Sequence, residues 1–63
     1  MRDVNRIDPF LQKIGTIWKT ECPDWRFGQL MYNFLSVYGD PFYWEEGDFL
    51  EMLEDYFNQS NEI

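Results

Sequence analysis

This chain has to fold without a covalent or metal cross-link, because its 63 residues contain one cysteine and no histidine. One cysteine cannot close an internal disulfide, and structural zinc sites need several Cys or His ligands. Chains of this size have difficulty burying enough apolar surface to fold alone. Aromatic residues, which each bury on the order of 200 Å², make up 21% of the chain. We therefore expect a single domain whose small core is built largely from aromatic rings.

The first helix is predicted to begin at Asp8 and to end within residues 20–22. Asp8 suits the N-cap, and Pro9 suits the first helical position, where its missing N–H is no loss. The residue before a proline avoids the helical region, so Pro23 stops the helix. Gly15 lies inside this helix and predicts the close approach of another backbone or a bulky ring. The apolar stripe of the helix comprises Phe10, Leu11, Ile14, Ile17 and Trp18.

The second helix is predicted to start at Pro23–Asp24 and to end at Gly39. Glycine suits a C-cap, and Asp40–Pro41 then prevents the helix from continuing. Gly28, beside the first apolar residue, predicts a close approach to another helix, and Gln29 is expected to face outward or to bond to the loop. The stripe of this strongly amphipathic helix comprises Phe27, Leu30, Met31, Phe34, Leu35 and Tyr38.

The third helix is predicted to begin at Asp48, with Glu51 completing a capping box. No segment alternates between apolar and polar residues as a strand would. The sequence thus predicts an all-α domain of three helices over residues 1–57, with an irregular loop over residues 40–47 and a frayed tail over residues 58–63. The apolar face of the third helix comprises Phe49, Leu50, Leu53, Tyr56 and Phe57.

The charges divide sharply between the two halves of the chain. Residues 1–28 carry five bases and four acids, whereas residues 29–63 carry eight acids and no base, so net charges of +1 and −8 sum to −7. One interpretation is a solvated face, with some acids paired to Lys13, Lys19 or Arg26. The other is a surface for a basic partner, whose approach the acidic field would accelerate.

Three adjacent rings, Phe42, Tyr43 and Trp44, lie in the predicted loop with acids on both sides. Neighbouring side chains in such a segment cannot all enter one core, so at least one ring should be exposed. Tyr and Trp are enriched at binding hot spots, and a polar rim around an apolar centre is typical of interfaces. Alternatively, Phe42 and Trp44 cap the core while Tyr43 lies on the surface. The predicted partner-binding residues are Phe42, Tyr43, Trp44, Glu45, Glu46, Glu51, Glu54 and Asp55.

We expect no enzymatic activity, no cofactor and no metal. Histidine is absent, and the acidic neighbours of Cys22 should raise the pKa of its thiol. No Gly-rich phosphate loop occurs. Asp40 and Glu51 have the spacing of the first and last ligands of an EF-hand, but aromatic residues occupy ligand positions between them. The alternative that stays open is a weak surface cation held by Glu45, Glu46 and Asp48.

Direct binding to DNA or RNA is not expected, because contact with phosphates needs a basic stripe that this sequence lacks. No run of apolar residues is long enough for a transmembrane helix. The amino terminus lacks the apolar stretch of a signal peptide. A cytoplasmic protein without membrane contact is therefore expected.

Short motifs run along most of the chain: IWK at residues 17–19, PDWRFGQL at 23–30, DPFY at 40–43, and Phe49, Leu50 and Leu53 further on. With these motifs, the chain resembles a group of short uncharacterised bacterial and phage proteins that share the pattern I-W, P-D-x-R-F-G-Q-L, D-P-F-Y-x-E and F-L-x-x-L. The resemblance covers roughly residues 6–57. It implies a bacterial or phage origin and a cytoplasmic setting, but no activity and no site residue.

The sequence favours a small acidic protein-interaction or inhibitor module that binds a basic partner surface through its aromatic loop and acidic third helix. A homo-oligomer that buries surplus rings between copies is one alternative. A DNA mimic is another. Four acids of the third helix span about 12 Å at 1.5 Å per residue, whereas duplex DNA carries about seven charges over that length. Mimicry would therefore also need the acids of the loop.

Overall fold

The computed structural model describes residues 2–60, with side chains described up to residue 58, and it consists of helices joined by short connections. A 3-10 turn, η1 (Val4–Arg6), precedes α1 (Ile7–Glu21), α2 (Phe27–Tyr38) and α3 (Glu46–Ser60). No strand occurs within residues 2–60. The predicted all-α domain of three helices, with an irregular loop between the second and the third, is confirmed.

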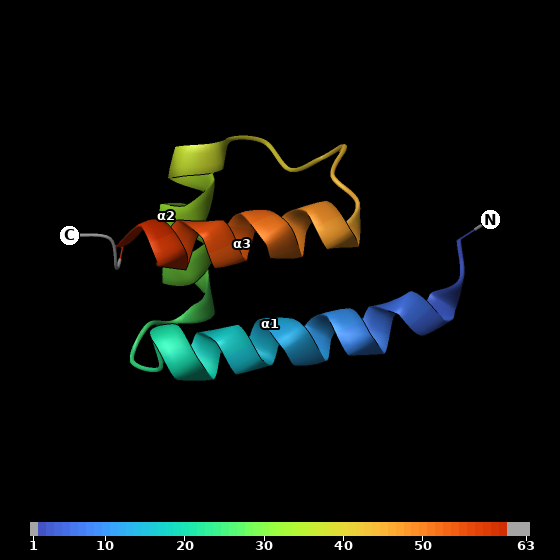
Figure 1. Ribbon diagram of the computed structural model, residues 1–63, viewed down its shortest axis with the longest axis horizontal. Coiled ribbons are helices and arrows are strands. Elements are labelled where there is room, and N and C mark those ends of the chain that lie inside the picture. The colour runs from blue at the N-terminus through green and yellow to red at the C-terminus, as the bar shows by residue number, and fades with distance from the viewer. Residues whose placement is uncertain (1, 61–63) are drawn as a thin grey trace.

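The helices α1 and α3 lie side by side and run in the same direction, while α2 crosses them steeply (Figure 1). The ring of Phe10 meets the ring of Phe49 near the start of both helices, at a centroid distance of 5.7 Å. This parallel arrangement brings the amino-terminal ends of α1 and α3 together at one end of the molecule (Figure 1).

Both of these helices begin earlier than the sequence predicts. Asp3, rather than Asp8, caps the helical segment, because its Oδ1 accepts a hydrogen bond from the Asn5 amide at 2.9 Å. Pro9 is still tolerated, because the first-turn N–H groups of a helix have no intrahelical acceptor. The third helix begins at Glu46, and Asp48 reaches back to the Glu45 amide at 3.3 Å instead of starting the helix.

The second helix begins three to four residues later than predicted, because the chain turns first. The amide of Trp25 donates to the Cys22 carbonyl at 3.1 Å, and the indole N–H of Trp18 donates to the Trp25 carbonyl at 2.8 Å. The Gln29 side chain then accepts from the Arg26 amide at 2.7 Å, just before α2. These bonds satisfy backbone groups in the turn, so the helix starts at Phe27.

The predicted end of α2 is confirmed at Gly39, which adopts a positive φ of 90° and donates to the Leu35 carbonyl at 2.7 Å. The predicted close approaches at Gly15 and Gly28 are wrong, since a Cβ added at either position would meet nothing within 4 Å. The tail prediction also starts too early. Residues 58–60 continue α3, and residues 61–63 lie outside the described residues.

The core is centred on Phe34, whose side chain is completely buried. Its ring lies 5.1 to 6.0 Å from four other rings, those of Tyr38, Trp44, Phe49 and Tyr56. Offset and edge-on ring pairs at such distances add stability beyond the area that they bury. The buried apolar side chains within residues 2–58 are Ile14, Cys22, Leu30, Phe34, Leu53 and Phe57.

Candidate protein-interaction surface

The three loop rings do not share one environment. The side chains of Phe42 and Tyr43 are 76% and 90% exposed, and the two rings meet edge to face at 4.8 Å. A tight turn presents them, in which Asp40 Oδ1 accepts from the Phe42 amide at 3.0 Å. Trp44 instead packs against the core, with its ring 6.0 Å from Phe34. Two of the predicted contact rings are thus on the surface, and the third supports the fold.

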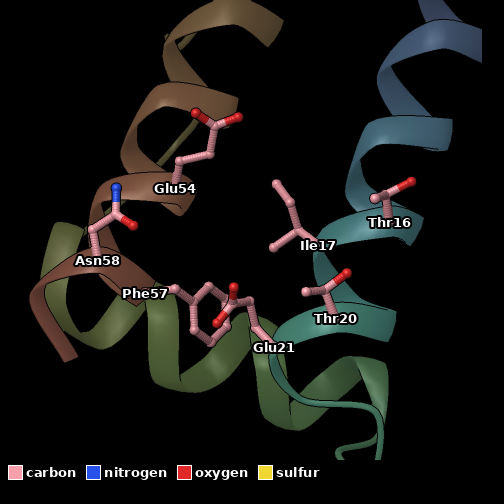
Figure 2. A pocket seen from close by; sticks show the side chains of 7 residues that line it. All are labelled: Thr16, Ile17, Thr20, Glu21, Glu54, Phe57 and Asn58. Carbon is pink, nitrogen blue, oxygen red and sulfur yellow. The ribbon is translucent and has the colours of Figure 1, made fainter. Parts of the chain in front are cut away.

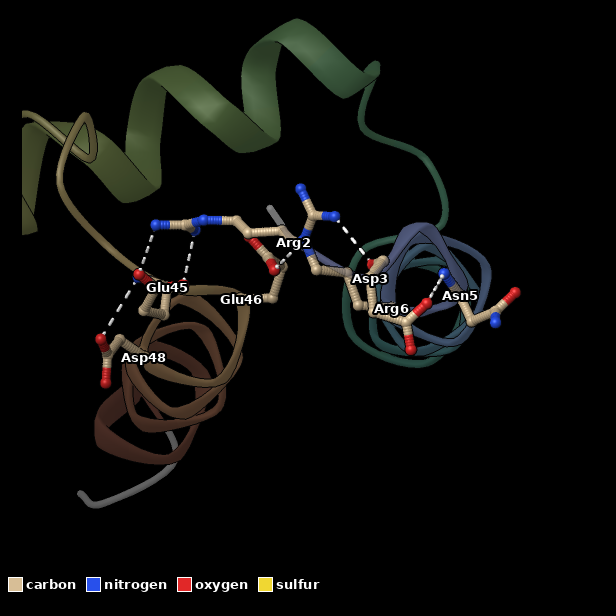
Figure 3. Close-up of polar contacts among 7 residues, drawn as sticks. All are labelled: Arg2, Asp3, Asn5, Arg6, Glu45, Glu46 and Asp48. Atoms are coloured by element: carbon tan, nitrogen blue, oxygen red, sulfur yellow. Dashed lines mark hydrogen bonds and ion pairs between the residues drawn. The ribbon is translucent and has the colours of Figure 1, made fainter.

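Glu45, the last residue before α3, and Glu46, its first residue, are paired with arginines at the amino terminus (Figure 3). The Arg2 guanidinium holds Glu45 through two bonds of 2.6 and 2.8 Å. Arg6 Nε lies 2.8 Å from Glu46 Oε1. These pairs link the start of α1 to the start of α3, and they show that some acids are neutralised from within the chain. The lysines that the solvated-face interpretation named form no ion pair within residues 2–58.

The outer face of α3 is acidic and exposed. Asp48, Glu51 and Asp55 share this face, because residues three and four apart are neighbours on a helix, while Glu54 is exposed beside the groove between α3 and α1. Within residues 2–58, neither Glu51 nor Glu54 pairs with a basic side chain. Asp55 Oδ2 accepts a hydrogen bond from the Tyr38 hydroxyl at 2.7 Å. This bond raises the pKa of Tyr38, with smaller contributions from burial and from the negative charge of Asp55.

A shallow groove of about 310 Å³ lies between the carboxyl-terminal halves of α1 and α3 (Figure 2). Ile17 and Phe57 supply apolar surface, while Thr20, Glu21 and Glu54 supply hydroxyl and carboxylate groups around them. Such a lining can accept hydrogen bonds from a polar partner. It contains no cysteine or lysine that could act as a nucleophile.

A second groove, of about 360 Å³ and almost wholly apolar, lies beside α2 and was not predicted. Leu11 and Phe27, which the helix stripes place in the core, are 56% and 49% exposed on its walls. One signal was available in the sequence. Phe10 and Leu11 are adjacent, so they project about 100° apart on a helix and need different neighbours. The residues that line this apolar groove are Phe10, Leu11, Ile14, Phe27, Met31, Pro41 and Phe49.

Cys22 is buried, and its burial, reinforced by the charge of Glu21, raises the pKa of the thiol. A thiol with a raised pKa is mostly protonated at neutral pH and is a poor nucleophile. Within the described part of the chain, no three potential metal ligands converge. Glu45 and Glu46, proposed above for a weak cation, hold arginines instead. None of the described helices is long and apolar enough to cross a membrane.

Comparison with known proteins finds no matching family model, no matching curated protein and no matching solved structure. The resemblance to short bacterial and phage proteins stays a prediction.

Proposed function

We propose that this chain is a small acidic module that binds a basic surface of another protein. The observation that carries the proposal is the exposed pair of Phe42 and Tyr43, in the loop that leads into an acidic α3. Large rings contribute little to folding when water surrounds them, whereas they contribute strongly to binding when a partner covers them.

Charge supports a basic partner. The chain carries a net charge of −7, and Glu51 and Glu54 lack a basic counterpart within residues 2–58. Acids at this spacing repel one another weakly, and a cationic surface would relieve that repulsion. The field would also accelerate encounter with a basic protein, an effect that salt screens.

The alternatives receive less support. A DNA mimic would need the loop acids, but Glu45 and Glu46 are already paired with Arg2 and Arg6. A homo-oligomer would bring a second net charge of −7 against the first, which opposes association. A partner of opposite charge therefore fits this surface better than DNA-like mimicry or a second copy does.

The test starts with a partner retained from a lysate of the source cell, whose affinity is then measured by calorimetry at low and high salt. Replacing both rings, Phe42→Ala with Tyr43→Ala, should weaken binding at least tenfold, which is about 1.4 kcal/mol. The double reversal Glu51→Lys with Glu54→Lys should also weaken binding and reduce its salt dependence.

The matched control is Asp8→Lys with Asp24→Lys, which makes the same change in net charge in the amino-terminal half of the chain. This control should leave the affinity nearly unchanged. If both charge reversals weaken binding equally, only overall charge matters, and the proposed surface is wrong. An affinity that does not change with salt, and that stays the same when both loop rings are replaced, would also contradict the proposal.

A further inference from the structure

The apolar groove beside α2 is open to solvent although its walls are large hydrophobic side chains. Its floor includes Ile14, which is only 6% exposed, while Leu11 and Phe27 on the walls are about half exposed. Ile7, one turn before Leu11 on α1, is also 43% exposed. Large apolar side chains that stay exposed around a hollow mark a candidate binding site.

This groove adjoins the surface already proposed for partner binding. Pro41 lines the groove and directly precedes the exposed ring pair of Phe42 and Tyr43. Phe27, on another wall, contacts the ring of Trp18 at 5.5 Å, which fixes its position. The exposed ring pair therefore begins one residue along the chain from a wall of the groove.

The net charge of the chain indicates which kind of partner the apolar groove can bind. A second copy would bring its own net charge of −7, which opposes association of two copies. A cationic partner meets attraction instead, and Asp40 directly precedes Pro41, which lines the groove. Arg26 adjoins Phe27, so we expect the partner's cations on the Pro41 side.

The volume of the groove further limits the kind of partner that it can bind. A volume of about 360 Å³ is enough for a few side chains but lies near the lower end of small-molecule sites. An apolar groove between helices can receive one face of an amphipathic helix, whose anchors recur at i, i+3 or i+4, and i+7.

We propose that the apolar groove binds the hydrophobic face of a basic amphipathic helix from another protein. Two or three large apolar side chains would enter between Leu11, Phe27 and Pro41, and lysines or arginines on the flanks would meet the acidic surface. This inference rests on the proposed function, for which it supplies the anchoring site and the chemistry of the partner.

The test uses the whole chain and a synthetic helical peptide of leucine and lysine whose leucines lie on one face. Methyl NMR of the methionines provides a built-in comparison, because Met31 lines the groove and Met52 packs elsewhere on the core. We expect the Met31 signal to shift on titration and the Met52 signal to stay. A peptide of the same composition, with leucines distributed around the helix, should bind at least tenfold more weakly.

Two variants probe the walls without removing a buried side chain. Leu11→Ser and Phe27→Ser should each weaken binding of the one-faced peptide at least tenfold. Val37→Ser is the matched control, because Val37 is 62% exposed on α2 but does not line the groove. Circular dichroism of each variant checks that the helices are retained.

The outcomes separate the two proposals. If the peptide binds and the loop and α3 variants weaken it while Leu11→Ser and Phe27→Ser do not, the proposed function stands and the groove is wrong. If Met31 shifts with protein concentration alone, the occupant is a second copy, and the inference fails. If neither peptide binds, both the groove and the preference for a basic partner are overturned.

Discussion

Phe34 and the pair formed by Phe42 and Tyr43 place the same kind of side chain in opposite surroundings. Phe34 is fully buried, with four rings within about 6 Å. Phe42 and Tyr43 are mostly exposed, and their ring contact is with each other. The aromatic residues of this chain therefore do not all serve the same role: some build the core, and others are exposed to solvent.

The difference follows from local structure. Phe34 lies on a helix, whose period directs every third or fourth side chain toward the same neighbours. Phe42 and Tyr43 lie in a turn, where no period directs adjacent side chains into the core. The helix therefore places Phe34 where it stabilises the fold, whereas the turn leaves Phe42 and Tyr43 available to a partner.

Phe34→Ala should have the largest effect on stability. Removing a buried phenylalanine costs about 3–5 kcal/mol, whereas a domain of this length has about 3–9 kcal/mol in total. We expect a variant that is unfolded or that melts at least about 12 °C lower by circular dichroism. Phe42→Ala is the control and should change the free energy of unfolding by about 0.5 kcal/mol or less. Equal losses of stability in Phe34→Ala and Phe42→Ala would contradict the distinction between buried and exposed rings.

Trp44→Ala should have an intermediate effect, because Trp44 adjoins the exposed pair in sequence but packs on Phe34 and Phe49. Its ring is only partly buried, so we expect a loss of about 2 kcal/mol, below the full value for a buried ring. Urea unfolding measures this loss. Trp44→Phe keeps much of the packing and should recover most of it. If Trp44→Ala unfolds like the wild-type chain, Trp44 belongs with the exposed rings.

The fold was largely predictable because its signals are local. Periodic apolar stripes predicted three helices, and Gly39 marked the end of α2. The helix starts were less predictable, because several acids and prolines near each start could act as caps. Asp3 and Gln29 make the bonds that decide two of these starts, and nothing in the local pattern singles them out.

The candidate surface was only partly predictable. The exposure of Phe42 and Tyr43 follows from three adjacent rings in a loop, but that of Leu11 and Phe27 does not. A stripe shows which side chains share a face, whereas burial also requires a neighbouring element to cover that face. The ion pair of Arg6 with Glu46 joins residues 40 apart, and it depends on α1 and α3 running in parallel.

Arg6→Ala tests whether the exposed region depends on its ion pairs for stability. The Arg6 and Glu46 side chains are about one-third exposed, so we expect a loss of up to about 1 kcal/mol that shrinks with added salt. Arg2→Ala should cost less, because both partners of that pair are 58% exposed. Urea unfolding at low and high salt measures both effects. Lys13→Ala removes the same charge without breaking an ion pair, and a loss as large as that of Arg6→Ala would contradict the assignment.

Tyr38→Phe should have the smallest effect, which is visible mainly through its pH dependence. The ring of Tyr38 packs on Phe34 and remains in the variant, whereas the hydrogen bond from its hydroxyl to Asp55 is lost. That bond raises the pKa of Tyr38 in the folded protein, so the folded state retains the phenol proton more tightly than the unfolded state. The resulting stabilisation is fully present below the ordinary tyrosine pKa of about 10, and it is lost as pH rises through the raised value.

The wild-type chain should therefore be slightly more stable than Tyr38→Phe in urea at neutral pH, and this advantage should disappear at strongly alkaline pH. Tyr43→Phe removes an exposed hydroxyl that makes no hydrogen bond within residues 2–58, and it should leave the stability unchanged at both pH values. If the wild-type chain has no advantage over Tyr38→Phe at neutral pH, Tyr38 acts through its ring alone. In that case the hydrogen bond between Tyr38 and Asp55 would contribute nothing to the stability of the fold. The ring packing around Phe34 would then account for the whole effect of Tyr38.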